Sequence, residues 1–234
     1  MISSRAFYVA PDAISGKNFL LDQNESDHVI RVLRMKEEDE IILLNGEGLG
    51  YYGLIKSIDN NVIGEIIDII PNLGENNYMV TLAPGLIKKN RFEIMLEKAT
   101  ELGIRDIQPL IMDRSIKRDL NIDRSINLIQ TAAKQSMRSR FPKINIPVKL
   151  KELLSQDGRF ICANIGETNS LSDINFRKNE KITIIIGPEG DFSDHEMQLM
   201  QNNRVQFYNL GKRRLRSETA ALNSLSVITF TILV

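Results

Sequence analysis

Short runs of β-branched and aromatic residues, separated by polar turns, make up roughly the first 70 residues of the chain. Such runs are typical of strands, and the breaks NGEG and DNN are typical of turns. Strands are expected at 7–10, 40–44, 51–58 and 62–70, and one short helix at 28–35. Several short strands with few helices favour a small β-barrel over residues 1–72.

After the polar stretch PNLGENN at 71–77, the pattern changes to strands that alternate with helices over residues 73–234. The runs at 160–164 and 182–186 are continuously apolar, which is typical of parallel strands buried on both faces. Further strands are expected at 78–83, 107–111 and 205–210, and helices at 90–102, 123–136, after 193 and from 217 onwards. The second part is therefore expected to be an α/β domain with a mostly parallel sheet.

Capping signals place the ends of three helices. Asn90, with Glu93 three positions on, is expected to cap the first helix, and Gly103 is expected to end it. Ser193 and Glu196 form the pattern of a capping box. Ser217 is expected to cap the apolar helix that runs towards the C-terminus.

The composition of the 234 residues is that of an ordinary soluble protein, with 42% hydrophobic and 26% charged residues. Lys+Arg and Asp+Glu number 30 each, so net charge neither indicates nor excludes a nucleic-acid partner. A single cysteine, Cys162, excludes an internal disulfide framework and fits a reducing compartment. With only two histidines, His28 and His195, no metal site is expected. No signal-type core or apolar stretch of about 20 residues occurs, so we expect a cytoplasmic protein outside the membrane.

Two glycine-bearing loops follow expected strands. GPEG (187–190) follows the run at 182–186, and LGKRRLRSE (210–218) follows the run at 205–210. Open α/β sheets bind ligands at the carboxyl ends of their strands, so these loops form walls of one crevice if the strands pair. The first loop by itself is more typical of a tight strand-to-helix turn than of a ligand site, and no P-loop lysine follows it. A third pattern, GLGYYG at 48–53, matches a dinucleotide fingerprint but lies between strands, so we interpret it as a hairpin connection.

Basic residues gather in several short segments although the chain has no net charge. Arg31 and Arg34 share a helical face with His28, and AAKQSMRSRFPKI (132–144) holds four cations and no acid. A further group, Lys88, Lys89 and Arg91, follows another expected strand. Such groups suggest contacts with phosphates, and scattered surface charge is the alternative.

Five motifs occur together in the order and spacing of one family: HVIRVLRM, EKATELGIRDIQP, QSMRSRFP, IIIGPEGDFS and LGKRRLRSETAAL. The chain resembles the bacterial 16S rRNA uracil-N3 methyltransferases of the SPOUT superfamily. The resemblance implies a PUA-like N-terminal barrel, an α/β domain with a deep trefoil knot, and a homodimer with composite active sites. It also implies S-adenosylmethionine as methyl donor and 16S rRNA of the small ribosomal subunit as substrate.

The resemblance also implies the site residues. The walls of the donor pocket would be Ile186, Gly187, Pro188, Glu189, Gly190, Leu210, Gly211, Leu215, Arg216, Thr219 and Ala220. Arg216 is expected to stabilise charge on the uracil carbonyl oxygens, and Glu218 or Glu189 to accept the proton of N3. The residues expected to hold the RNA are Arg5, His28, Arg31, Arg34, Lys88, Arg91, Arg138 and Arg140.

Three positions depart from the family's usual residues. Asp191 and Met137 stand where glycine is common, and Arg214 stands where a small apolar residue is common. Two other functions also fit the sequence. One is a SPOUT methyltransferase acting on another RNA such as tRNA, and the other is a non-catalytic RNA-binding assembly factor.

Overall fold

The structure is a computed structural model that describes residues 6–76, 78–177 and 180–233. Contacts group the chain into two compact units, Met1–Glu75 with Gln130–Phe141, and Asn76–Ile129 with Pro142–Val234. The division of the chain into 1–72 and 73–234 stays a prediction. The contacts differ from it in one respect, because 130–141 groups with the first unit.

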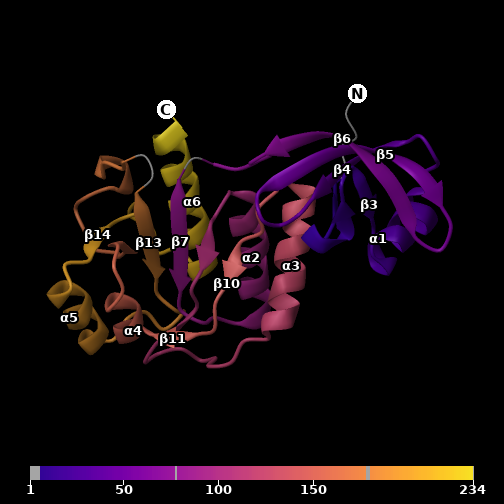
Figure 1. Ribbon diagram of the computed structural model, residues 1–234. Helices are drawn as coiled ribbons and strands as arrows, with labels where there is room; N and C mark the ends of the chain where they lie inside the picture. The colour runs from indigo at the N-terminus through magenta and orange to yellow at the C-terminus, as the bar shows by residue number, and fades with distance from the viewer. Residues whose placement is uncertain (1–5, 77, 178–179, 234) are drawn as a thin grey trace. The chain divides into compact units, whose positions relative to one another are not determined.

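The first unit is built on a six-stranded mixed sheet, shown in indigo and purple in Figure 1. Its strands in spatial order are β1 (Ala6–Tyr8), β4 (Glu40–Leu44), β5 (Leu49–Ile58), β6 (Val62–Pro71), β3 (Asn18–Leu20) and β2 (Ile14–Ser15). β1 is parallel to β4 and the other pairs are antiparallel. Among the described residues β1 and β2 are the edges of the sheet. The expected barrel is therefore a half-barrel.

The half-barrel closes over an apolar core. Phe7, Phe19, Leu43 and Ile55 are among the side chains buried there. Three short helical segments flank the sheet: η1 (Pro11–Ala13), α1 (Gln23–Asp27) and a π-helical turn, η2 (His28–Leu33). The strands β2 and β3 were missing from the sequence prediction, because each is too short to show a period of two.

The GLGYYG pattern lies in the β4–β5 hairpin, as predicted, but only Gly48 belongs to the connection and residues 49–53 are part of β5. Gly48 has φ +113 and Leu49 begins β5 directly after it. The side-chain oxygen of Asn45 accepts hydrogen bonds from the backbone N–H groups of Glu47 and Leu49, at 2.8 and 2.9 Å. No helix N-terminus is present at this loop, whose residues are all described, so it lacks the group that would bind a pyrophosphate.

The second unit contains a six-stranded sheet in which every pair is parallel. Its strands in spatial order are β10 (Lys143–Ile144), β8 (Asp106–Ile107), β7 (Met79–Pro84), β13 (Lys181–Ile186), β12 (Arg159–Ala163) and β14 (Gln206–Tyr208). A separate parallel pair joins β9 (Leu110–Ile111) to β11 (Val148–Lys149). The predicted α/β architecture with a mostly parallel sheet is confirmed, and the threading of the chain into a trefoil knot stays a prediction.

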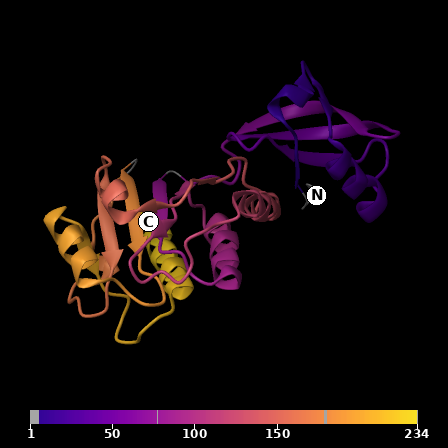
Figure 2. The same cartoon turned by 90° about the horizontal axis from the view of Figure 1, so that it is seen from below.

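Helices cover both faces of this sheet (Figures 1 and 2). The helices of the chain after the half-barrel are α2 (Lys89–Glu101), α3 (Ile122–Gln135), α4 (Leu150–Leu154), η3 (Leu171–Asp173), α5 (Asp194–Asn202) and α6 (Ser217–Leu233). Cys162 and Ile185 lie side by side and pack in one cluster with α4 and α5. The next residues in the register, Ile161 and Ile184, are also fully buried. This burial on both faces explains why β12 and β13 are apolar without alternation.

Three predicted helix and strand boundaries were wrong. Ser217 does not cap α6, because it is the first residue of that helix and the carbonyl of Arg216 already accepts from the N–H of Ala220. Asn90 does not cap α2, because the carbonyl of Lys88 already accepts from the N–H groups of Arg91 and Phe92, and the helix begins at Lys89. The expected strand at 107–111 is split into β8 and β9, which belong to different sheets. Gly103, with φ +87, follows the end of α2 as predicted. The described helices include none long and apolar enough to cross a membrane.

The capping box of α5 is confirmed. Ser193 Oγ accepts from the N–H of Glu196 at 3.2 Å, and Glu196 accepts in return from the N–H of Ser193 at 2.9 Å. Glu196 also accepts from the N–H of Asp113 at 2.9 Å, and Ser193 Oγ donates to the Asp113 carboxylate. These bonds fix the start of α5 against the segment that follows β9.

Candidate functional site

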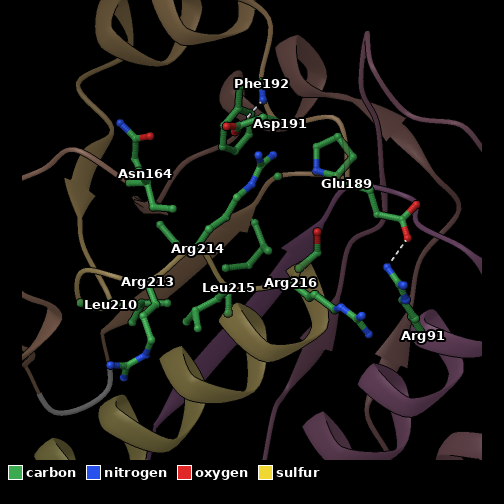
Figure 3. Close-up of a pocket in the computed structure, with 18 residues that line it drawn as sticks. Arg91, Asn164, Glu189, Asp191, Phe192, Leu210, Arg213, Arg214, Leu215 and Arg216 are labelled. Atoms are coloured by element: carbon green, nitrogen blue, oxygen red, sulfur yellow. Dashed lines mark hydrogen bonds and ion pairs between the residues drawn. The ribbon is translucent and has the colours of Figure 1, made fainter.

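A cavity of about 340 Å³ lies at the carboxyl edge of the parallel sheet (Figure 3). Its walls are the loops that follow β12, β13 and β14. In the register, Ala163 of β12 pairs with Tyr208 of β14, while Cys162 pairs with Ile185 of β13. The two glycine-bearing loops therefore share one crevice, as expected. They do not follow neighbouring strands, because β12 lies between them and adds a third wall.

The loop after β13 leaves room for the cavity through its glycine and its turn. A Cβ atom at Gly187 would lie 3.0 Å from the ring of Phe192, so glycine lets this ring close one side of the cavity. The N–H of Asp191 donates to the carbonyl of Pro188 at 3.0 Å, which closes a four-residue turn.

Asp191 adopts φ +64, a left-handed conformation that glycine takes without cost. Its own carboxylate accepts from the N–H of Phe192 at 2.9 Å, a local bond that lets aspartate tolerate this conformation. The departure from glycine therefore keeps the turn. It also adds a carboxylate to the cavity lining.

The loop after β14 supplies apolar and basic side chains. Gly211 has φ +106 with nothing near the place of a Cβ, so backbone conformation alone explains this glycine. Leu210 and Leu215 line the cavity, and α6 begins at Ser217. Arg213, Arg214 and Arg216 also line it and are exposed, which makes the mouth strongly basic. Arg214 therefore adds charge at a position where a small residue is usual.

One buried hydrogen bond ties β14 to α6. The hydroxyl of Tyr208 donates to Ser224 Oγ at 2.8 Å, and both side chains are fully buried. Burial raises the pKa of Tyr208, so the phenol stays a neutral donor. The bond fixes the last helix relative to the strand that precedes the basic loop.

Arg91, from the first turn of α2, also lines the cavity. Its Nη1 donates to Glu189 Oε1 at 2.6 Å, the dashed contact in Figure 3. Its Nε lies 3.7 Å from Glu218 Oε1. The second oxygen of Glu218, Oε2, is buried and has no hydrogen-bond partner among the described residues. Glu218 itself does not line the cavity.

Most of the residues expected to bind a cofactor line this cavity. They are Ile186, Gly187, Pro188, Glu189, Leu210, Gly211, Leu215, Arg216 and Ala220. Gly190 and Thr219 were expected in the lining and are outside it. Gly190 instead lies against Arg114, whose Nη1 donates to its carbonyl at 3.4 Å, and Thr219 is exposed on the first turn of α6.

Several lining residues were missed by the sequence analysis. Ala163, Asn164 and Ile165 follow the apolar run of β12 and reach the same edge as the other two loops. The apolar run of β12 could have predicted them, because the carboxyl ends of all strands in a parallel sheet lie at the same edge. The loop carries no glycine until Gly166, and glycine was the feature that drew attention to the other loops.

The residues expected to hold RNA fall into accessible and inaccessible groups. Lys88, Arg31, Arg34 and His28 are exposed. Arg31 pairs with Asp27 at 3.3 Å, and His28 lies edge-on to Phe7 with ring centres 5.8 Å apart. Arg5 lies outside the described residues.

Arg138 requires correction, and the expected role of Arg91 in RNA binding stays a prediction. The side chain of Arg138 is 2% exposed and its Nη2 donates to Glu75 Oε2 at 2.8 Å, so a phosphate cannot reach it in this structure. Arg91 is paired with Glu189 and Glu218, so its charge is already balanced. The basic segment 132–144 is less basic than its sequence suggests, because Lys134 also pairs with a carboxylate, that of Glu25.

Arg140 is half-buried. Its backbone N–H donates to Glu75 Oε1 at 2.9 Å, and its guanidinium lies where a Cβ at Gly48 would be. Met137 has φ +60 and ends α3 in a left-handed conformation. The N–H groups of Met137 and Arg138 donate to the carbonyls of Lys134 and Ala133, which is a Schellman motif with methionine at the glycine position. The departure at Met137 therefore keeps the helix end at a conformational cost.

Comparison with known proteins gives the class. Residues 74–229 match a family described as "RNA methyltransferase domain", and residues 21–68 match one described as "RNA methyltransferase PUA domain". A parallel sheet with a cavity at its carboxyl edge, following a PUA half-barrel in the chain, thus defines an RNA methyltransferase. Among the described residues, no group of three or more His, Cys, Asp or Glu side chains is placed to hold a metal ion.

Similar whole proteins identify the family. The chain is 34% identical over 212 residues to "Ribosomal RNA small subunit methyltransferase E" of Mesomycoplasma hyopneumoniae (strain 232), covering 88% of this chain and 92% of that protein. It is 27% identical over 231 residues to the protein of that name in Bacillus subtilis (strain 168), covering 91% and 90%. A crystal structure of the Neisseria gonorrhoeae protein of that name, bound to S-adenosyl methionine, has a TM-score of 0.88 at 27% identity and covers 97% of each chain. The chain belongs to the ribosomal RNA small subunit methyltransferase E family.

Proposed function

We propose that this enzyme transfers a methyl group from S-adenosylmethionine to N3 of one uridine in 16S rRNA. The observation that carries the proposal is the cavity at the carboxyl edge of β12, β13 and β14. It lies in a fold that matches a donor-bound relative over nearly its full length. The proposal includes a homodimer and a cytoplasmic location, which rest on the family resemblance.

The cavity fits a nucleoside bearing a charged tail. Its volume of about 340 Å³ lies within the range of small-molecule sites, roughly 300–1,000 Å³. Ile186, Leu210 and Leu215 provide an apolar slot for adenine, and the backbone at Gly187 and Gly211 can approach the ligand closely. When bound, the donor supplies a methyl group on a sulfonium, which is an electrophile for a ring nitrogen.

The target nitrogen sets two demands on the protein. N3 lies on the Watson–Crick edge, so the uridine must be unpaired or flipped out of its stack. Neutral uracil carries a proton on N3, and the negative charge that develops as it leaves is shared with the two carbonyl oxygens. Alignment of donor and acceptor can contribute about 7–11 kcal/mol to the rate, so much of the catalysis is positioning.

Arg216 is proposed to stabilise the charge on the uracil. It lines the cavity and is exposed, and none of the described carboxylates pairs with it. In Figure 3 its side chain extends to the same side as Arg91 and Glu189. A guanidinium is a strong donor to a developing oxyanion. Glu218 or Glu189 is the proposed acceptor of the N3 proton; of the two, Glu189 lines the cavity and Glu218 does not.

The exposed basic residues are proposed to hold the RNA backbone. The exposed ones are His28, Arg31, Arg34 and Lys88. The half-buried Arg140 is proposed with them, and so is Arg5, which lies outside the described residues. Lys and Arg side chains that neutralise phosphates release counterions, so RNA binding should weaken steeply as salt rises. Binding to another RNA would show the same salt dependence. Only the position of the methyl group distinguishes 16S rRNA from another RNA as the substrate.

Replacing Arg216 tests the chemical step. Arg216→Ala should lower turnover by about 100-fold or more, because an oxyanion donor is lost. The donor Kd should stay within about threefold, since the cavity's apolar slot is unchanged. Lys212→Ala is the matched control, because it removes a positive charge from the same loop at an exposed position outside the lining. Unchanged turnover in Arg216→Ala would exclude the assigned role.

A further inference from the structure

Arg91 connects three elements around the cavity. It stands on the first turn of α2, while Glu189 lies in the loop after β13 and Glu218 in the first turn of α6. The contacts are 2.6 Å from Nη1 to Glu189 Oε1 and 3.7 Å from Nε to Glu218 Oε1. One side chain thus links the two glycine-bearing loops that β12 holds apart in the sheet.

The burial of the three groups makes this link strong. The side chains of Arg91, Glu189 and Glu218 are 31%, 18% and 13% exposed. Oε2 of Glu218 is fully buried without a hydrogen-bond partner among the described residues. One cation is therefore shared by two carboxylates, and water screens the three charges only in part.

We infer that Arg91 is a positioning residue, whose pairing with Glu189 and Glu218 holds the cavity walls in the geometry that binds the methyl donor. The inference rests on the proposed function, because the donor is the ligand. It replaces the role in RNA binding that the sequence suggested for Arg91. A phosphate contact would require the guanidinium to leave both carboxylates.

The inference predicts a particular coupling between the charges. Without Arg91, Glu189 and Glu218 lose the cation that they share, and their like charges then disfavour the arrangement of the two loops. Neutralising Glu218 in the same molecule removes that repulsion. If Arg91 only filled space, or contacted the donor or RNA directly, Glu218→Gln would not restore the donor binding lost in Arg91→Gln.

The experiment measures binding of S-adenosylmethionine by calorimetry to the full-length protein and to Arg91→Gln, Glu218→Gln and the double variant. Arg91→Gln should weaken donor binding about tenfold or more, since a charge-assisted contact is lost and two carboxylates are left unbalanced. The double variant should return to within about threefold of Glu218→Gln. Lys89→Gln is the matched control, because Lys89 is an exposed cation of the same helix turn whose partner, Glu93, is outside the cavity.

Two further measurements distinguish this positioning role from a space-filling role and from a loss of folding. Arg91→Lys keeps the charge but cannot span both carboxylates, so its donor affinity should lie between wild type and Arg91→Gln. Thermal unfolding checks that each variant folds, and Arg91→Lys serves in place of Arg91→Gln if the latter does not. Additive losses in the double variant, or unchanged donor binding in Arg91→Gln, would overturn the inference. Absence of donor binding by the wild-type protein would instead overturn the proposed function.

Discussion

Replacing Arg138 separates a role in the stability of the fold from a role in binding RNA. Arg138 lies in QSMRSRFP among other cations, yet only 2% of its side chain is exposed. It donates to Glu75, whose other oxygen accepts from the N–H of Arg140 at 2.9 Å. We predict that Arg138→Met destabilises the fold and does not change the affinity for RNA, because other cations contact the RNA.

The magnitude follows from the burial of the pair. Removing one partner of a buried ion pair leaves the other charge uncompensated and costs about 3–5 kcal/mol. Glu75 is 9% exposed, so water cannot replace the lost guanidinium. Arg31 is the comparison: its side chain is 74% exposed beside Asp27, and losing an exposed pair costs at most about 1 kcal/mol.

Urea unfolding and RNA binding measured against salt separate the two roles. Arg138→Met should lose about 3–5 kcal/mol of unfolding free energy, and Arg138→Met with Glu75→Gln should recover part of it. At urea concentrations where the variant is folded, its salt slope for RNA should equal that of wild type. Arg31→Ala should leave stability nearly unchanged and reduce the slope by about one phosphate contact. A flatter salt slope in Arg138→Met without loss of stability would instead show that Arg138 contacts a phosphate.

Three further predictions concern single positions. Met137→Gly should raise the unfolding free energy by about 0.5–1 kcal/mol, because φ +60 strains a side chain; a lower value in urea unfolding would contradict it. Gly187→Val should abolish donor binding in calorimetry with the fold intact, because its side chain would meet the Phe192 ring that a Cβ already approaches to 3.0 Å; normal binding would contradict it. Burial raises the pKa of the Asp106 carboxyl, so the free energy of unfolding falls as pH rises through that pKa and the group ionises. Asp106→Asn should therefore be more stable than wild type at neutral pH, and this difference should vanish in acid.

The sequence predicted correctly those helices and strands that neighbouring residues determine. The continuous apolar runs of β12 and β13 and the Ser193–Glu196 box are such cases, since burial on both faces and helix capping each leave a direct trace in the sequence. The carboxyl-edge site followed from the same reasoning, because parallel strands end at one edge.

The features that the sequence did not predict depend on residues far apart in the chain. The position of β12 between β13 and β14 is a matter of strand order, which no local pattern contains. Arg138 is neutralised by Glu75, 63 positions away, and Arg91 by Glu189, 98 positions away. A basic residue therefore looks like a surface cation until its partner is known.

The most direct test of the central claim supplies the purified protein with radiolabelled S-adenosylmethionine and small ribosomal subunits that lack the modification. Nuclease digestion and mass spectrometry then locate the methyl group. The account predicts label on N3 of one uridine of 16S rRNA, and loss of that label with Arg216→Ala. Donor binding without label on the subunits, or label on another atom, would contradict the proposed substrate. No donor binding at all would contradict the assignment of the cavity.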